Sequence, residues 1–201
     1  MAGTADYTQT FSQTVEGYKI KYGVLFGNEK IVFIKVGTDG TIRGYQDKYP
    51  RMARRIHERT GATVICSSNP DISAERKLEA DKAFIEKIIA EQDYENCEFY
   101  FVGTSDGAEH SLKLALQFPK TVKFLGISSS WSVEAEFLKM VKDLSCEKKI
   151  FAYGTDDEDF DVIVPRLKAL DCDNLELIIF DGVDHFFTGK VDDFIALIDV
   201  I

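Results

Sequence analysis

The sequence has 201 residues, of which 45% are hydrophobic and 29% charged, as expected for a soluble globular chain with a sizeable core. Asp and Glu outnumber Lys and Arg by 34 to 24, which gives a net charge of −10. Such an acidic surface repels phosphate backbones and anionic lipids, so the composition argues against nucleic acids and membrane surfaces as partners.

The chain is expected to begin with β structure and then to alternate regularly between strands and helices. Residues 1–9 are expected to precede the first element. Residues 11–26 alternate apolar and polar side chains around two glycines, which indicates one or two strands and favours an antiparallel hairpin at a sheet edge. The strands expected after this hairpin are, in order, 31–36, 62–66, 99–102, 122–127, 149–153 and 175–180.

A helix is expected between successive strands from 31–36 onward, and another at the end of the chain. The first of these helices ends at Gly61, which is suited to the left-handed residue after a helix. The last shows an i, i+3, i+4, i+7 apolar stripe from Val191 to Ile201. The other helices are expected from near Ser73 to Ile89, between Ser105 and Pro119, and over 134–144 and 160–170.

Short apolar strands followed by helices predict an α/β fold. Its sheet should be mostly parallel, with an antiparallel N-terminal edge and helices on both faces. In such folds ligands bind beyond the carboxyl ends of the strands, so the loops that follow the strands are the candidates for a site. The sequence contains no internal repeat, and residues 1–201 are interpreted as a single domain.

Two features of the sequence indicate a reduced, cytoplasmic setting. The first twenty residues lack a basic segment followed by an apolar one, and no apolar run is long enough to span a bilayer. The four cysteines form no C-x-x-C pair and lie at no zinc-ligand spacing from a histidine, so no metal site is expected.

Residues 98–119 contain the pattern around which the chemistry is organised. An apolar strand pattern leads into GTSDG (residues 103–107), which fits the G-x-S-x-G nucleophile elbow, and a helical pattern follows. Such a sharp turn needs small neighbours, and its two glycines and Ala108 supply them. The turn should expose the Ser105 hydroxyl and place the Asp106 N–H at a helix N-terminus, where negative charge is favoured. An ordinary turn with a capping serine is the alternative.

A serine that transfers acyl groups needs a base, and the chain has three histidines. His57 lies among charged residues of a helix, which favours a solvated face. His110 lies in the helix after Ser105, where a surface or packing role is favoured. His185 follows the last strand, in DGVDHFF (181–187), and is the candidate base. A loop histidine that caps the final helix is the alternative.

The acid that orients the base is expected between Ser105 and His185 in the chain. The loop after strand 149–153 is rich in aspartates, so several carboxylates are possible. Asp157 is preferred over Asp156 because the acid usually stands three residues after the glycine at this position.

The serine, aspartate and histidine candidates, each at a strand end and in this order, resemble the triad of the α/β-hydrolase superfamily. The segment GVDHFFTG (182–189) resembles one found in small, lidless bacterial members. The resemblance covers the chain from about Ile31 onward. It implies the α/β-hydrolase fold without a lid domain, since only about twenty residues separate Ser128 from the strand at Lys149.

The resemblance also implies a role for each site residue. Ser105 would attack an acyl carbonyl while His185 takes its proton. Asp157 would hold the imidazole. The backbone N–H groups of Thr38 and Asp106 would bind the oxyanion. No metal or organic cofactor is needed for this chemistry.

The loop VGTDG (residues 36–40) departs from the family pattern. Many members have His-Gly there; this chain keeps the glycine and lacks the histidine, and backbone donors do not depend on that side chain. Asp39 would oppose an anion if it pointed inward. The loop lacks the G-K-[ST] ending of a phosphate-binding loop, and no G-x-G-x-x-G follows the first parallel strand, so a nucleotide binder is disfavoured.

The preferred function is a serine hydrolase that cleaves a small soluble carboxylic ester or thioester, with a small-molecule acyl substrate as its partner. Two alternatives stay open: a hydrolase-like scaffold that binds without turnover, favoured by the altered loop, and acyl transfer to an acceptor other than water. Trp131, beside the loop after strand 122–127, either lines the cleft or is a half-buried packing residue.

Overall fold

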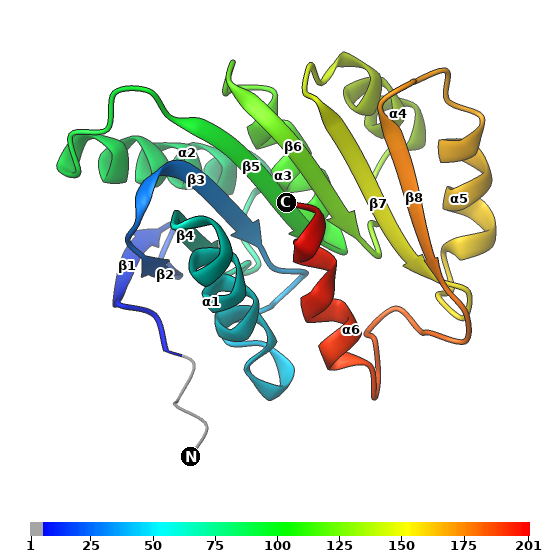
Figure 1. Ribbon diagram of the computed structural model, residues 1–201, viewed down its shortest axis with the longest axis horizontal. Helices are drawn as coiled ribbons and strands as arrows, with labels where there is room; N and C mark the ends of the chain where they lie inside the picture. The colour runs from blue at the N-terminus through cyan, green and yellow to red at the C-terminus, as the bar shows by residue number, and fades with distance from the viewer. Residues whose placement is uncertain (1–5) are drawn as a thin grey trace.

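The structure is a computed structural model and describes residues 6–201. Its centre is an eight-stranded sheet with the strand order β1-β2-β4-β3-β5-β6-β7-β8 (Figure 1). The strands are β1 (Gln9–Val15), β2 (Tyr18–Leu25), β3 (Asn28–Lys35), β4 (Ala62–Ser67), β5 (Glu98–Thr104), β6 (Thr121–Ile127), β7 (Lys148–Gly154) and β8 (Leu175–Phe180). Strands β3 to β8 are parallel, whereas β1 and β2 form an antiparallel hairpin at one edge. The predicted sheet and its antiparallel edge are confirmed.

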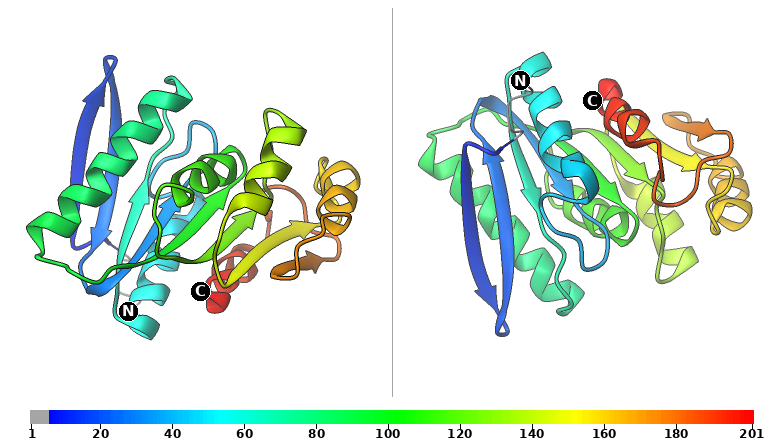
Figure 2. Two further views of the ribbon diagram at one scale, coloured as in Figure 1. Left: turned by 90° about the horizontal axis from the view of Figure 1, so that it is seen from above. Right: turned by 90° about the horizontal axis from the view of Figure 1, so that it is seen from below.

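Helices cover both faces of this sheet (Figure 2). They are α1 (Lys48–Thr60), α2 (Ala74–Glu91), α3 (Asp106–Ala115), α4 (Glu134–Asp143), α5 (Phe160–Lys168) and α6 (Val191–Ala196), with short 3₁₀ helices η1 (Tyr45–Asp47) and η2 (Leu197–Val200). Helices α2 to α5 share one apolar core with the sheet, and α1 and α6 share the other. Because both faces are buried, the central strands consist of nearly continuous apolar residues.

The expected elements are present, with small differences at their ends. Helix α1 ends at Gly61, which adopts φ 68°, and the Ser73 side chain caps α2 by accepting from the Arg76 N–H. The last helix differs from its prediction, because α6 stops at Ala196 and η2 replaces its final turn. Leu197 and Ile198 of η2 are nevertheless buried in the core. Of the segment expected before the hairpin, residues 1–5 lie outside the described part.

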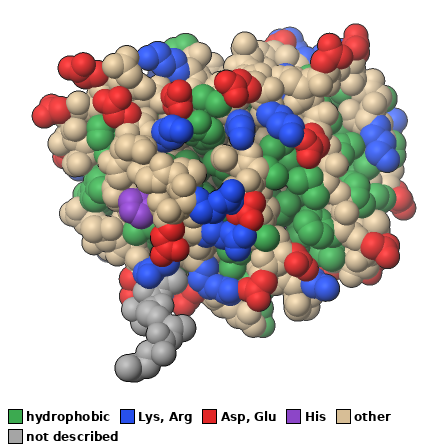
Figure 3. All heavy atoms as spheres, viewed as in Figure 1, with side chains coloured by type: hydrophobic (Ala, Val, Ile, Leu, Met, Phe, Trp, Pro, Cys, Tyr) green, Lys and Arg blue, Asp and Glu red, His purple; other side chains and the backbone are tan. Residues whose placement is uncertain are grey.

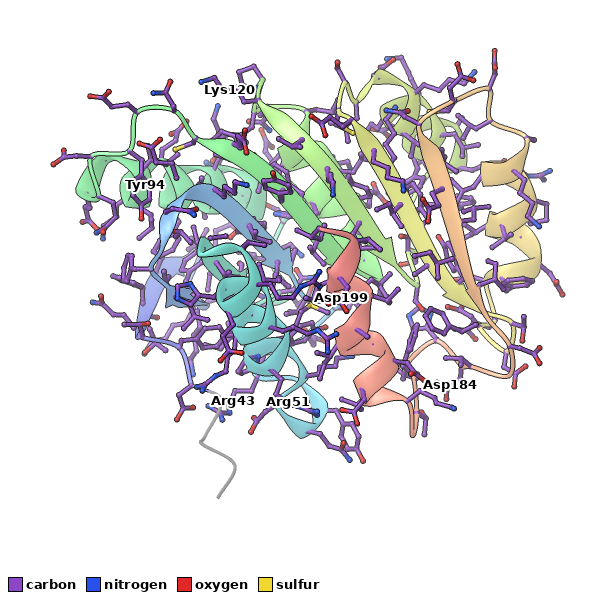
Figure 4. The ribbon with its side chains drawn as sticks, viewed as in Figure 1. Arg43, Arg51, Tyr94, Lys120, Asp184 and Asp199 are labelled. Carbon is purple, nitrogen blue, oxygen red and sulfur yellow. The ribbon has the colours of Figure 1, made fainter. Side chains whose placement is uncertain are left out.

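Ion pairs join the C-terminal helix to α1. Arg51 pairs with Asp192, and Arg55 pairs with Asp199. Figure 3 shows basic and acidic side chains gathered on this face, and Figure 4 labels Arg51 and Asp199 between the two helices. These side chains are partly exposed, so each pair contributes little to stability. The first pair joins α1 to the start of α6, and the second joins it to η2.

The connection between β6 and β7 contains α4 and no inserted lid domain, as predicted. Over residues 6–201, none of the helices combines the length and apolar character needed to cross a membrane. The assignment of residues 1–201 to a single domain stays a prediction.

Candidate active site

Ser105 stands on a sharp turn between β5 and α3. Its backbone adopts φ 54° and ψ −131°, a combination that a residue with a side chain seldom adopts. The turn is possible because its neighbours are small. A Cβ atom on Gly103 would lie 2.3 Å from the Cα of Ala108, and one on Gly107 would lie 2.3 Å from the carbonyl oxygen of Val36. The predicted strand, sharp turn and helix are confirmed.

Three side chains from separate strand ends form one hydrogen-bonded chain. The Nε2 atom of His185 lies 3.0 Å from the Oγ of Ser105, and its Nδ1 atom lies 3.1 Å from both carboxylate oxygens of Asp157. The carboxylate must accept from Nδ1–H, so Nε2 is the free acceptor for the serine hydroxyl. Figure 4 labels Asp184, the residue before His185, in the loop beyond β8. The structure therefore brings together the three residues predicted from the sequence.

The electrostatics of the pair formed by His185 and Asp157 suit a general base. The hydrogen bond to Asp157 raises the pKa of His185, although burial opposes this rise. Burial alone would raise the pKa of Asp157, but hydrogen bonds from His185 and from the Asp159 N–H outweigh it and lower that pKa. The carboxylate therefore stays ionised beside the imidazole, where its negative charge favours the protonated form of the ring.

The structure distinguishes between Asp156 and Asp157, the two neighbouring candidates for the acid that orients the base. Asp157 is 4% exposed and contacts the imidazole, whereas the Asp156 side chain is exposed. Oxygen and nitrogen atoms of Asp157, Asp159 and His185 lie within 4.8 Å of one another, close enough to be metal ligands. Asp157 already accepts from the imidazole Nδ1–H, which a metal on that nitrogen would displace. This grouping is therefore better explained as an acid–base pair.

The other two histidines do not reach the serine. The Nδ1 atom of His57 lies 2.8 Å from the carbonyl oxygen of Ala62, at the end of α1, and the ring is half-buried rather than on the solvated face that was expected. His110 is buried within α3, in keeping with the expected packing role, and its Nε2 atom lies 2.8 Å from Asp81.

The backbone N–H groups of Thr38 and Asp106, which are expected to bind an oxyanion, belong to the two loops that meet at Ser105. Asp106 is the first residue of α3, where an N–H has no acceptor within the helix. Thr38 follows Gly37, whose Cα hydrogens face the nucleophile, because a Cβ there would lie 3.2 Å from the Cβ of Ser105. Within residues 6–201 no hydrogen bond uses the Thr38 N–H. Asp39 is exposed to solvent.

A residue that the sequence analysis did not identify, Asn69, holds this loop in place. It is 1% exposed, and its N–H donates to the carbonyl oxygen of Gly40 at 3.1 Å. Its side-chain amide donates to the carbonyl oxygen of Val36 at 3.2 Å and to the carboxylate of Asp106 at 3.0 Å. One side chain thus links both ends of the 36–40 loop to the residue after the nucleophile. Its position after β4 was the only signal in the sequence.

A cluster of buried polar groups, also absent from the sequence analysis, lies behind the site. We call Lys35, Ser67, Asp81 and His110 the Lys35 cluster. One carboxylate oxygen of Asp81 lies 2.7 Å from the Lys35 ammonium and 2.8 Å from His110, and the other accepts from the Ser67 hydroxyl at 2.8 Å. Lys35 and Asp81 are completely buried. The cluster joins β3, which leads to the 36–40 loop, to α3, which follows Ser105.

Aromatic residues near the site have unequal roles. The Trp131 ring packs 5.1 Å from the ring of Phe137 and contacts the core under α4, so its packing role is the one observed. Phe186 stands edge-on to the imidazole of His185, with ring centroids 5.1 Å apart, and is 73% exposed. An aromatic ring is therefore exposed beside the candidate base.

The same architecture occurs in solved structures. The chain matches a serine hydrolase homologue from Coxiella burnetii with a TM-score of 0.75 at 16% identity, and covers 95% of each chain. A serine hydrolase without a lid from Xanthomonas campestris gives a TM-score of 0.68 at 18% identity, with coverage of 96% of this chain and 93% of that one. Est1E from Butyrivibrio proteoclasticus gives 0.72 at 11% identity, with coverage of 96% and 97%. No protein-family model matches the sequence, and neither does any curated protein.

These likenesses, at identities of 11% to 18%, define the fold. The chain has the lidless α/β-hydrolase fold, with a Ser–His–Asp hydrogen-bonded chain at the carboxyl edge of its sheet.

Proposed function

We propose that this protein is a serine hydrolase that cleaves a small carboxylic ester or thioester through an acyl-enzyme on Ser105. The observation that supports this most strongly is the hydrogen-bonded chain from Ser105 through His185 to Asp157, with contacts of 3.0 and 3.1 Å. A nucleophile needs a base within this distance and a third group to orient the base, and all three are present.

The proposed reaction has two steps. In the first, the Ser105 Oγ bonds to the carbonyl carbon while its proton moves to Nε2 of His185, and the oxyanion lies between the N–H groups of Thr38 and Asp106. The carbon–oxygen or carbon–sulfur bond of the substrate then breaks, and the leaving group takes the proton from His185. In the second step, water attacks the acyl-enzyme with His185 as its base, which releases the acid and restores the serine.

Small acyl compounds suit this site because no inserted domain covers the carboxyl edge of the sheet. The partner that we propose is therefore a small-molecule acyl substrate, rather than a nucleic acid or a membrane. The four cysteines are free thiols, which is compatible with the proposed cytoplasmic setting.

A serine-directed fluorophosphonate tests this proposal. Ser105 is expected to attack the phosphorus and displace fluoride, which leaves a stable adduct on the protein. The wild-type protein should label and should hydrolyse an activated acetate ester such as para-nitrophenyl acetate. Labelling should be lost in Ser105→Ala and in His185→Ala, since the first lacks the nucleophile and the second lacks its base.

Ser145→Ala is the matched control, because Ser145 is an exposed serine in the loop before β7, at the opposite edge of the sheet. It should label like the wild type. A folded wild-type protein that neither labels nor hydrolyses the ester would refute the hydrolase and favour the binding scaffold.

The backbone donor of the oxyanion loop is tested by Thr38→Pro. Proline removes the N–H at this position, and the loss of one oxyanion donor lowers kcat by about 10²–10³-fold. Thr38→Ala keeps the N–H and should leave kcat close to the wild-type value. Steady-state kinetics on para-nitrophenyl acetate measure both variants. Equal loss in the two variants would show that the side chain, rather than the N–H, is the important group.

A further inference from the structure

A groove with a volume of about 970 Å³ lies beside the 36–40 loop. It lies between one face of the β1–β2 hairpin, with Ser12 and Lys21, and the loops 39–43 and 68–71. We call it the hairpin groove. It exists because β2 pairs with β4 only as far as Tyr22 and Ser67, so the rest of the hairpin extends past the carboxyl end of β4.

The wall of the groove is built by Tyr7. A Cβ atom on Gly23 would lie 2.3 Å from the Tyr7 ring, so the ring can lie against the hairpin only because that position is a glycine. The Tyr7 hydroxyl donates to the carbonyl oxygen of Ile42 at 2.6 Å, which ties the N-terminal segment to the loop after β3. Figure 4 labels Arg43 of this wall, which pairs with Asp6 at 2.9 Å.

The hairpin groove begins close to the nucleophile. Gly37 approaches Ser105, and the Gly40 N–H donates to the carbonyl oxygen of Gly37 at 2.9 Å, which closes a β-turn. The ends of such a turn are less than about 7 Å apart. Asp39 and Gly40, at the far end of this turn, line the groove. A substrate whose carbonyl lies at Ser105 therefore needs to extend only past one turn to reach it.

The lining of the groove indicates what it binds. Its apolar and aromatic side chains are Tyr7, Phe11, Tyr18, Ile42 and Pro70. Its formal charges sum to zero, because the lining contains three basic residues, Lys19, Lys21 and Arg43, and three acidic ones, Asp6, Asp39 and Asp71. A lining without net charge does not favour a charged ligand. Burial of apolar surface is therefore the main driving force for binding. The volume falls within the range that accommodates a drug-sized ligand.

We propose that the hairpin groove binds the bulky, uncharged aryl or alkyl part of an ester whose carbonyl is attacked by Ser105. This proposal rests on the proposed function and narrows its substrate class. The preferred esters are those with one large apolar group, while the remaining part of the substrate is small.

Two pairs of esters test the proposal. Para-nitrophenyl octanoate and acetate differ in the acyl part, and naphthyl acetate and phenyl acetate differ in the alcohol part. The wild-type kcat/KM should be at least about tenfold higher for the larger ester in one of the pairs, because each buried apolar group favours binding. The pair that shows this preference identifies the part of the substrate held in the groove.

Ser12→Trp places a large ring in the groove and should abolish this preference. Gln13→Trp is the matched control, because adjacent residues of a strand point to opposite faces and Gln13 does not line the groove. Lys21→Trp, at the position paired with Ser12, is the second variant in case the first fails to fold. Thermal melts check that each variant is folded.

The outcomes separate the two proposals. Absence of turnover on all four esters would overturn both the hydrolase and the groove assignments. Turnover without a size preference, or with a preference that Ser12→Trp and Lys21→Trp leave intact, would overturn the groove assignment alone. Loss of the preference in these variants, and its retention in Gln13→Trp, supports it.

Discussion

Replacing Asp157 with Asn is expected to lower kcat about 10⁴-fold. The carboxylate accepts the Nδ1–H of His185, and this contact leaves Nε2 as the acceptor for the Ser105 hydroxyl. An amide at position 157 can instead donate to Nδ1, which places the imidazole proton on Nε2 and removes the base. Steady-state kinetics on an activated acetate ester measure the effect.

The neighbouring residue supplies the control for this prediction. Asp156→Asn removes the same charge from the exposed side chain next in the chain, and should change kcat by less than about tenfold, since it leaves the contact with His185 intact. Equal losses in the two variants would contradict the assignment of Asp157.

The pH profile gives an independent readout of the same pair. In the wild type, kcat/KM should fall as pH drops through the raised pKa of His185, because the protonated imidazole cannot act as a base. In Asp157→Asn the carboxylate no longer raises that pKa, so the fall should occur at a lower pH. A profile that does not move would show that Asp157 has no electrostatic effect on His185.

Replacing Lys35 with Met is expected to destabilise the fold by about 3–5 kcal/mol near neutral pH. The change removes the ammonium that lies 2.7 Å from the completely buried Asp81 carboxylate, so the carboxylate keeps only Ser67 and His110 as donors. Urea denaturation measures the loss. Lys82→Met is the control, because Lys82 follows Asp81 on α2 and its side chain is partly exposed. Loss of this ammonium should change the free energy of unfolding by less than about 0.5 kcal/mol.

The destabilisation by Lys35→Met should also depend on pH. In the wild type, burial and the Lys35 ammonium lower the pKa of His110, so the ring is neutral. Without Lys35, the Asp81 carboxylate should raise that pKa above its value in the unfolded chain. The stabilisation by protonated His110 is then fully present below the unfolded pKa and is lost as pH rises through the folded pKa. The loss of unfolding free energy in Lys35→Met, relative to the wild type, should therefore become smaller between pH 8 and about pH 6. A loss that is constant over this range would contradict the Lys35 cluster as described.

Local pattern was sufficient to predict the sheet and the residues of the candidate triad. Each central strand is a short apolar run followed by a helical pattern, and Gly61 marks the end of α1. The elbow could be predicted because its glycines and serine are contiguous in the sequence. The base and the acid were predicted from their positions after strands, since parallel strands place their carboxyl ends at one edge.

Contacts between distant segments could not be predicted in the same way. Lys35 stands in the otherwise apolar run 31–36, which signals a buried partner, but nothing in the sequence connects it to Asp81 in α2 or His110 in α3. Asn69 is one of many polar loop residues until the fold places it between Gly40 and Asp106. The hairpin groove depends on the register between β2 and β4, which the alternation of residues 11–26 leaves undetermined.

The Lys35 cluster also constrains how this chain can diverge. A cation, an anion and a neutral ring are enclosed together, so a change at position 35 leaves the charge at position 81 without its cation. In descendants of this sequence, positions 35, 81 and 110 should therefore covary, and an apolar residue at one should accompany uncharged residues at the others. Because these positions lie behind the 36–40 loop and Ser105, the residues that support the candidate active site should be inherited as a unit, while the hairpin groove remains free to change.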